Sequence, residues 1–212
     1  MSARGLAVDL ERRGIRDRRV LEAFAAVRRE AFVPGQERHA YDDNPLHIGH
    51  GQTISQPYVV AVTVEALALK GHERVLEIGT GSGYAAAILA QLAGEVDTIE
   101  RIAELAAIAW DRLARLAPGV RVHVGDGTLG VPSRAPFDAI AVAAGAPRPP
   151  QRLLQQLAIG GRIVLPTGGA DHQQLMRITR TGADSFEELA LGDVRFVPLV
   201  GADGWPSADA AR

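Results

Sequence analysis

The chain has 212 residues, 47 % of them apolar and 23 % charged, with a formal net charge of −2; these values predict one globular domain and exclude the overall basic field of a dedicated nucleic-acid binder. Cysteine is absent, which excludes disulfides, thiolate metal sites and cysteine nucleophiles. No apolar run is long enough to span a membrane and no secretory signal begins the sequence, so we expect a cytoplasmic protein without membrane or nucleic-acid partners.

The first third is predicted to be helical and then irregular. Asp17 is a candidate N-cap for a helix with one apolar face. That face comprises Val20, Leu21, Phe24 and Val27. The arginines of residues 1–30 alternate with acids and lack aromatic neighbours, which favours a solvated helix face over an RNA-binding patch. Residues 34–57 are rich in Pro, Gly, His, Asn and Asp and predict a long irregular connection, which is usually functional.

From Arg74 onward, short apolar runs alternate with helical patterns, which is typical of a parallel sheet with right-handed crossovers. The expected strands are Arg74–Ile78, Glu95–Ile99, Val120–Val124, Phe137–Val142 and Gly161–Leu165, and the expected helices are Gly83–Leu92, Ile102–Leu116 and a short one near Leu153–Leu157. Three further strands, Gln174–Thr181, Glu187–Leu191 and Arg195–Leu199, predict an antiparallel C-terminal addition.

These patterns predict an α/β fold in which one domain spans residues 1–212. Residues 1–73 form its N-terminal helical and acceptor-loop segment, residues 74–200 form a doubly wound, mostly parallel core, and residues 202–212 form a flexible tail.

The glycine-rich segment Glu77–Gly83 stands where the first core strand meets its helix. Open α/β sheets bind ligands at this edge, and glycines let the backbone approach a ligand closely. A dinucleotide fingerprint would need a third glycine where the chain has Tyr84, and no Lys-Ser or Lys-Thr pair follows as in a phosphate-binding P-loop. The motif alone is therefore a weak signal, compatible with a mere tight turn.

Three acids make the signal more specific. Glu77 precedes the glycines, Glu100 ends the second strand, and Asp126 follows the third. We expect Glu100 to bind a ribose diol and Asp126 to reach an adenine amino group. Three carboxylates would repel a pyrophosphate and suit a positively charged nucleoside. They predict S-adenosylmethionine as the cofactor and a class I methyltransferase of Rossmann-like fold with an N-terminal helical cap. No metal is expected, because His47 and His50 stand in a glycine-rich loop without an adjacent third ligand.

A polar string, Gly51–Pro57, precedes the core and reads Gly-Gln-Thr-Ile-Ser-Gln-Pro. Six further segments share a pattern with one known family: Arg29–Pro34, Ala40–Asp43, Thr98–Arg101, Gly125–Thr128, Ala135–Asp138 and Arg195–Leu199. Through these segments, the string and the glycine turn, the chain resembles the protein-L-isoaspartate O-methyltransferases, which methylate damaged aspartyl residues. The string around Ser55 is the specific part of the likeness, because the glycine turn is common to methyltransferases at large.

The resemblance implies that Ser55 is the active-site serine and that Thr53 helps to line the acceptor pocket. It also implies that Gln173 lies over the cofactor and that Arg195–Leu199 borders a peptide groove. The expected substrate-binding residues are Thr53, Phe196, Val197 and Leu199. The expected cofactor-binding residues are Glu77, Gly79, Thr80, Gly81, Ser82, Gly83, Glu100, Arg101, Asp126, Gly127 and Gln173.

The chemistry of the acceptor agrees with this assignment. A carboxylate is already ionised at neutral pH, so it can attack a methyl sulfonium without a general base. Positioning and exclusion of water would then be the enzyme's main tasks, with the Ser55 hydroxyl orienting one carboxylate oxygen. We therefore expect methyl transfer from S-adenosylmethionine to the free carboxylate of L-isoaspartyl residues in damaged proteins or peptides, which initiates repair through a succinimide.

Two alternative functions differ from this one in the acceptor or in the absence of catalysis. The acceptor could be an ordinary aspartate in a dedicated peptide partner, or the chain could bind S-adenosylmethionine or isoaspartyl peptides without catalysis. An RNA base is disfavoured, because the loop Ala143–Pro147 has no aromatic residue to grip it. Two departures from the family pattern, His47 and Ala143–Gly145, lie near the acceptor region and bear on substrate preference.

Overall fold

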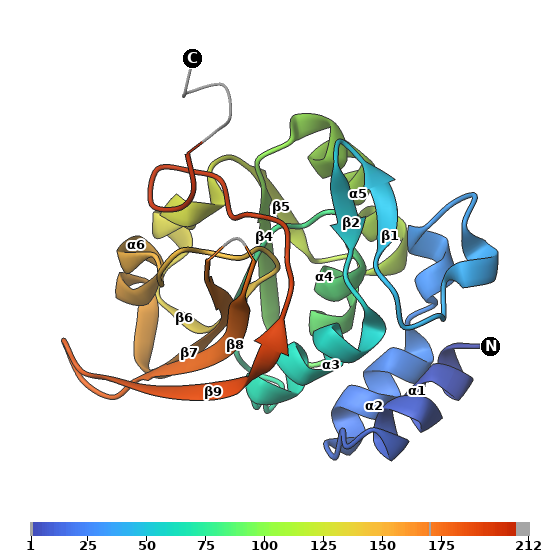
Figure 1. Ribbon diagram of the computed structural model, residues 1–212, viewed down its shortest axis with the longest axis horizontal. Coiled ribbons are helices and arrows are strands. Elements are labelled where there is room, and N and C mark those ends of the chain that lie inside the picture. The colour runs from blue at the N-terminus through green and yellow to red at the C-terminus, as the bar shows by residue number, and fades with distance from the viewer. Residues whose placement is uncertain (1, 170, 207–212) are drawn as a thin grey trace.

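A seven-stranded sheet forms the centre of the protein, with its strands in the order β5-β4-β3-β6-β7-β8-β9 (Figure 1). The computed structural model describes residues 2–169 and 171–206. The strands are β3 (Arg74–Ile78), β4 (Glu95–Glu100), β5 (Arg121–Val124), β6 (Phe137–Val142), β7 (Leu157–Gly168), β8 (Gln173–Arg180) and β9 (Phe186–Val194). Strands β3 to β7 pair in parallel, whereas β8 and β9 add antiparallel strands at one side. The predicted doubly wound fold is confirmed.

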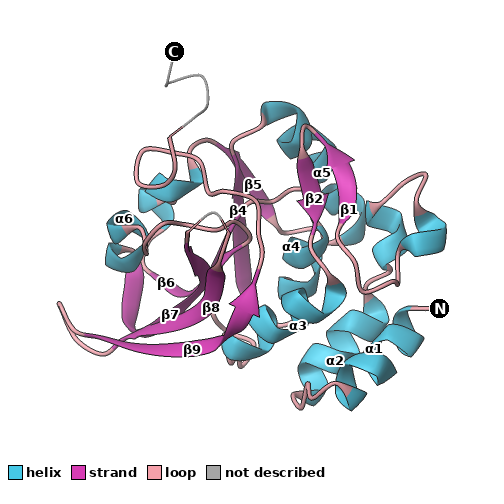
Figure 2. Cartoon of the chain, in the orientation of Figure 1, coloured by secondary structure: helices cyan, strands magenta, loops and turns pink. Residues whose placement is uncertain are grey.

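The near-continuous apolar runs of the central strands arise because both faces of the sheet are covered. On one face, Val75 and Ala139 pack with the helices α3 (Pro57–Ala66), α4 (Tyr84–Leu89) and α5 (Ala103–Leu116). On the other face, Leu76 and Ile140 pack with α6 (Gln151–Gln155). Helices therefore lie on both sides of the parallel strands (Figure 2), and the strand ends are left free to form sites.

The N-terminal segment adds the helices α1 (Ala3–Arg12) and α2 (Arg18–Ala26). Asp17 caps α2 as predicted, because its side chain accepts a hydrogen bond from the Arg19 amide at 2.8 Å. The face predicted to be apolar packs inward, with Val20 and Phe24 buried. Among the described residues, no helix is both long and apolar enough to cross a bilayer.

Residues 34–57 contain more order than the sequence predicts. They include a two-stranded hairpin of β1 (Leu46–Gly49) and β2 (Gln52–Ile54), closed by a turn in which Gly49, His50 and Gly51 all have positive φ angles. The strands are too short, and too rich in glycine around the turn, to stand out as an alternating pattern. The hairpin leads directly to α3 (Figure 1).

The expected strand Arg195–Leu199 is wrong. The segment is extended and bonds to the loop after β6: the Gly145 amide donates to the Val197 carbonyl and the Leu199 amide to the Gly145 carbonyl, both at 2.8 Å. It cannot pair with β8, because β9 already occupies that edge, and Pro198 has no amide hydrogen to donate.

Of the expected flexible tail, residues 207–212 lie outside the described residues. Residues 202–206 bond to the body of the protein. The indole nitrogen of Trp205 donates to the Gly145 carbonyl at 3.0 Å, and the Ala202 amide donates to Asp126 at 2.7 Å.

Candidate active site

The turn between β3 and α4 depends on its glycines. Gly79, Gly81 and Gly83 have φ angles of +91°, +51° and +88°, a region that residues with a Cβ rarely adopt. The Gly81 amide donates to the Glu100 carboxylate at 3.0 Å. Gly83 begins α4 and packs on Leu113, where a Cβ would lie 3.1 Å from Leu113 Cγ. Gly79 and Gly81 thus face the pockets described below, whereas Gly83 serves helix packing.

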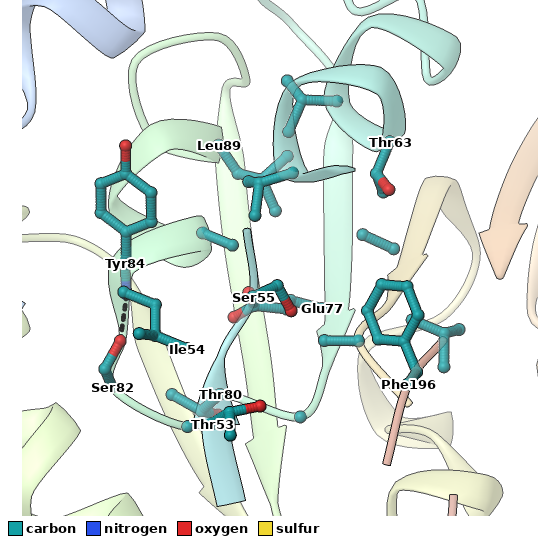
Figure 3. Close-up of a pocket in the computed structure, with 18 residues that line it drawn as sticks. Thr53, Ile54, Ser55, Thr63, Glu77, Thr80, Ser82, Tyr84, Leu89 and Phe196 are labelled. Carbon is teal, nitrogen blue, oxygen red and sulfur yellow. Dashed lines mark hydrogen bonds between the residues drawn. The ribbon is translucent and has the colours of Figure 1, made fainter. Parts of the chain in front are cut away.

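Three adjacent pockets with shared lining residues surround this turn. The inner pocket is lined by residues that include Ser55, Glu77, Thr80, Ser82, Tyr84 and Phe196 (Figure 3). The strand-end pocket is lined by residues that include Glu100, Arg101, Gly127, Val197 and Leu199. The outer groove is lined by Pro45, Thr53, Ser55, Gln56, Val59, Ala143, Arg195, Phe196, Val197 and Pro198. Thr53 and Ala143 line all three, so the pockets meet at these two side chains.

Glu77 is the buried acid of the inner pocket, with only 1 % of its surface exposed. Burial raises the pKa of Glu77 to about 8, and the nearby charge of Glu100 adds to this, although a hydrogen bond from Thr98 opposes it. The Thr98 hydroxyl donates to the carboxylate at 2.6 Å and is itself 2.7 Å from the Thr80 hydroxyl. A cation in this pocket would favour the ionised form of Glu77.

Glu100 ends β4 and lies in the wall of the strand-end pocket, 6 % exposed. Its two carboxylate oxygens accept hydrogen bonds from the amides of Gly81 and Ile102, each at 3.0 Å. Each oxygen retains a lone pair that could accept from a ligand hydroxyl. Arg101, next in the chain, is exposed at the same pocket.

Asp126 lies beside these pockets, and its carboxylate is bonded within the protein. Its carboxylate accepts hydrogen bonds from the Thr128 amide, the Thr128 hydroxyl and the Ala202 amide, at 2.8, 2.6 and 2.7 Å. It is not among the residues lining the strand-end pocket, whereas Gly127 is. A Cβ at Gly127 would lie 2.5 Å from Ile78 Cγ2, so glycine permits the close packing of β3 against this turn.

Gln173 lies behind the site and bonds to the segment after β9. It is 3 % exposed and is not among the residues lining the three pockets. Its side-chain carbonyl accepts from the Phe196 amide at 2.8 Å, and its amide nitrogen donates to the Phe196 carbonyl at 3.3 Å. Gln173 therefore holds Phe196, which lines the inner pocket and the outer groove.

The hairpin and the segment after β9 supply opposite sides of the site. Figure 3 places Ser55 near the centre of the inner pocket, between Tyr84 on one side and Phe196 on the other. Of the predicted substrate-binding residues, Thr53, Phe196 and Val197 line the outer groove. Leu199 is buried and lines the strand-end pocket instead.

Sequence reasoning missed the central place of Ala143 and treated it only as a departure from a family pattern. Ala143 follows β6 at the carboxyl edge of the sheet, and it lines every one of the three pockets. The same rule that singled out Glu100, a residue directly after a parallel strand, could have identified it. Gln56, within the string around Ser55, lines the outer groove; Thr63 lines the inner pocket, and nothing in the sequence pattern distinguishes it.

Comparisons with known proteins bear on what this arrangement does. A family profile described as protein-L-isoaspartate(D-aspartate) O-methyltransferase matches residues 1–204. A relative in Rhodopseudomonas palustris, named protein-L-isoaspartate O-methyltransferase 1, is 59 % identical over 96 % of this chain and 84 % of its own. A Marinobacter nauticus relative, named protein-L-isoaspartate O-methyltransferase 2, is 60 % identical over 92 % of this chain and 90 % of its own.

Among solved structures, a Plasmodium falciparum chain described as a protein-L-isoaspartate O-methyltransferase in complex with S-adenosyl-L-homocysteine is similar in fold. The two chains are 27 % identical, with a TM-score of 0.84, and the match covers 94 % of this chain and 99 % of the other.

Proposed function

This chain belongs to the protein-L-isoaspartate(D-aspartate) O-methyltransferase family, and we infer that it carries out the reaction for which its relatives are named. It transfers a methyl group from S-adenosylmethionine to the free carboxylate of L-isoaspartyl residues in damaged proteins and peptides. The resulting ester activates the carbonyl, the next amide nitrogen closes a succinimide, and hydrolysis returns part of the residues to aspartate. The shared wall of the outer groove and the inner pocket, in which Ser55 lines both and Glu77 lines the inner one, is the observation that carries this function.

The inner and strand-end pockets fit S-adenosylmethionine. Gly79 and Gly81 line both pockets with main-chain atoms alone, which lets a ligand approach the backbone. Glu100 offers carboxylate oxygens to the ribose hydroxyls, and buried Glu77 supplies a negative charge for the cationic part of the cofactor. When bound, S-adenosylmethionine supplies an electrophilic methyl group on a positively charged sulfur.

The residues of the outer groove suit an acceptor that needs no deprotonation. The side chains lining it, all within the described ranges, include no carboxylate and no imidazole. An isoaspartyl carboxylate, ionised at neutral pH, needs no general base. The Ser55 hydroxyl donates a hydrogen bond to one oxygen and leaves the other free to attack. The apolar side chains of Val59, Phe196 and Val197 exclude water from the ion pair.

Proteins and peptides that contain isoaspartate are thus the substrates, and the extended segment Arg195–Pro198 is the wall along which their backbone lies. The cytoplasmic location and the absence of nucleic-acid partners stay predictions of the sequence.

Transfer from a methyl-labelled donor to paired peptides, one with isoaspartate and one with aspartate at the same position, tests this function. We expect base-labile label on the isoaspartyl peptide only, because a methyl ester hydrolyses in mild base. Equal labelling of both peptides would instead indicate an enzyme for ordinary aspartate. Binding of S-adenosylhomocysteine without any transfer would indicate a non-catalytic binder.

Ser55→Ala examines the acceptor role separately. Turnover should fall while the affinity for S-adenosylhomocysteine, measured by calorimetry, stays unchanged. Ser133→Ala, at an exposed serine in the short 3-10 helix Pro132–Arg134, is the matched control. An equal loss of S-adenosylhomocysteine affinity in Ser55→Ala would place this serine in the cofactor site instead.

A further inference from the structure

Ser55 lies in the two-residue connection between β2 and α3. On its N-terminal side, Ile54 is buried and pairs with Leu46 across the hairpin, which fixes that end of the connection. On its C-terminal side, Gln56 leads into Pro57, the first residue of α3. The direction of the Ser55 hydroxyl therefore depends on what holds Gln56 and the start of α3.

Asp43, from the preceding loop, holds both. Its main-chain carbonyl accepts a hydrogen bond from the side-chain nitrogen of Gln56 at 2.9 Å. Its carboxylate accepts a hydrogen bond from the Tyr58 amide at 3.0 Å. One residue thus bonds directly to the neighbour of Ser55 and to the first turn of the helix that follows.

The start of α3 needs this external partner. Gln56 stands at the N-cap position but makes no side-chain capping bond, and Pro57 has no amide hydrogen. The Tyr58 amide is then the first helical donor in need of an acceptor. A carboxylate at this place satisfies the donor and also interacts favourably with the positive end of the helix dipole.

Asp43 is itself held from two directions. Arg13, at the end of α1, lies 2.6 Å from its carboxylate and stacks 4.0 Å from the centre of the Tyr58 ring. Buried Arg29 donates to the carbonyls of Ala40 and Asn44, at 2.6 and 3.5 Å, and so fixes the main chain around Asp43. Asp43 is therefore a fixed point against which the Ser55 connection rests.

We propose that Asp43 is a positioning residue for methyl transfer, which holds the Ser55 hydroxyl at the acceptor carboxylate through its bonds to Gln56 and Tyr58. This assignment rests on the role proposed for Ser55. Asp43 lines none of the three pockets, so it acts through Ser55 and not on the substrate. Small errors in the position of a reacting group have large effects on rate, which is why a remote cap can control turnover.

Turnover of an isoaspartyl peptide by the full chain tests the proposal. We expect Asp43→Ala to lower kcat by roughly tenfold or more, with the affinity for S-adenosylhomocysteine unchanged. Both variants keep the main-chain carbonyl that accepts from Gln56, but only Asp43→Asn keeps a side-chain oxygen for the Tyr58 amide, so it should recover most of the wild-type kcat. Asp17→Ala removes the N-cap of α2, away from Ser55, and should lower the melting temperature without changing kcat.

A double-mutant cycle separates positioning from general stability. If Asp43 acts through Ser55, Asp43→Ala has no further effect on kcat in a Ser55→Ala background. Two results would overturn the proposal: kcat of Asp43→Ala within about twofold of wild type, or independent, multiplying effects in the double variant. If Asp43→Ala does not fold, the same double-mutant cycle is run with Asp43→Asn. A fall in kcat on Asp43→Asn that is equally large in the Ser55→Ala background would also contradict the proposal. Methyl transfer by the wild-type chain tests the proposed function by itself. Failure of that function can therefore be distinguished from failure of the role proposed for Asp43.

Discussion

The Thr98 hydroxyl on β4 donates a 2.6 Å hydrogen bond to the carboxylate of Glu77, which lies opposite it on the neighbouring strand β3. The bond favours the ionised carboxylate, yet burial dominates and raises the pKa of Glu77 to about 8. The ligand-free protein therefore keeps a protonated acid at the base of its inner pocket at neutral pH. This makes Glu77 sensitive to both pH and ligand charge.

The first prediction concerns stability without ligand. Because the pKa of Glu77 is raised in the folded state, the protonated acid contributes to the stability of the fold. This contribution is fully present below about pH 4.5 and is lost as pH rises through about 8. The free energy of unfolding should fall on this account by on the order of 1 kcal/mol per pH unit within that window. Chemical denaturation at several pH values measures it. Glu77→Gln should flatten the dependence, and exposed Glu104→Gln should not.

The second prediction concerns the cofactor. A cationic ligand near Glu77 favours the carboxylate, so binding should release a proton below pH 8 and tighten as pH rises from 6 to 8. Calorimetry of S-adenosylmethionine in two buffers of different ionisation enthalpy measures the released proton. Proton uptake, or the same release in Glu77→Gln, would show that another group titrates on binding.

The third prediction concerns Glu100. Glu100→Ala removes the acceptor for ribose hydroxyls and leaves the Gly81 amide without its partner. We expect the affinity for S-adenosylhomocysteine to fall by roughly tenfold or more, since each lost bond to a charged acceptor costs about 1.5–3 kcal/mol. Calorimetry checks this, with Glu104→Ala, an exposed acid on α5, as the control. Unchanged affinity would remove Glu100 from the cofactor site.

The fourth prediction concerns Asp126, whose carboxylate holds the Ala202 amide instead of facing the strand-end pocket. Asp126→Ala should loosen the segment that ends at Trp205 and increase hydrogen exchange at the Ala202 and Thr128 amides. Affinities for adenosine and for purine riboside, which lacks the amino group, should fall equally. A loss confined to adenosine would mean that Asp126 binds the adenine amino group after all.

The fifth prediction concerns Arg195, the one charged side chain among the residues lining the outer groove. Isoaspartyl peptides with an acidic neighbour should have a lower KM than basic ones, by about two- to fivefold, because exposed ion pairs contribute up to about 1 kcal/mol. The difference should vanish at high salt and in Arg195→Gln. Equal KM values in wild type would mean that the groove ignores flanking charge.

The sequence predicts the central sheet well because burial on both faces leaves a direct trace in composition. Phe137–Val142 is apolar except for Asp138 near its start, and its observed bounds as β6 are those expected. Likewise, an N-cap is a local signal, and Asp17 caps α2 as its position indicates. Both features depend on neighbours within a few residues along the chain.

Features set by distant partners were less predictable. Arg195–Leu199 looks like a strand because it is extended and apolar, yet its bonding partner is the loop at Gly145. Asp126 stands directly after a strand as expected, and its carboxylate bonds to Thr128, two residues on, and also to the Ala202 amide, 76 residues later. Side-chain direction depends on such long-range bonds, which no local periodicity encodes.

The hydroxyl of Ser55 and the residues that hold it all precede β3, whereas the carboxylates of Glu77 and Glu100 lie on β3 and β4. The group that orients the acceptor and the acids proposed for the cofactor thus belong to different stretches of one gene. Recombination that replaced only the leading stretch, through α3, would change how the acceptor is oriented and leave both acids in place. Such a division offers a route by which one nucleotide-binding core could diversify its acceptors without reinventing its chemistry.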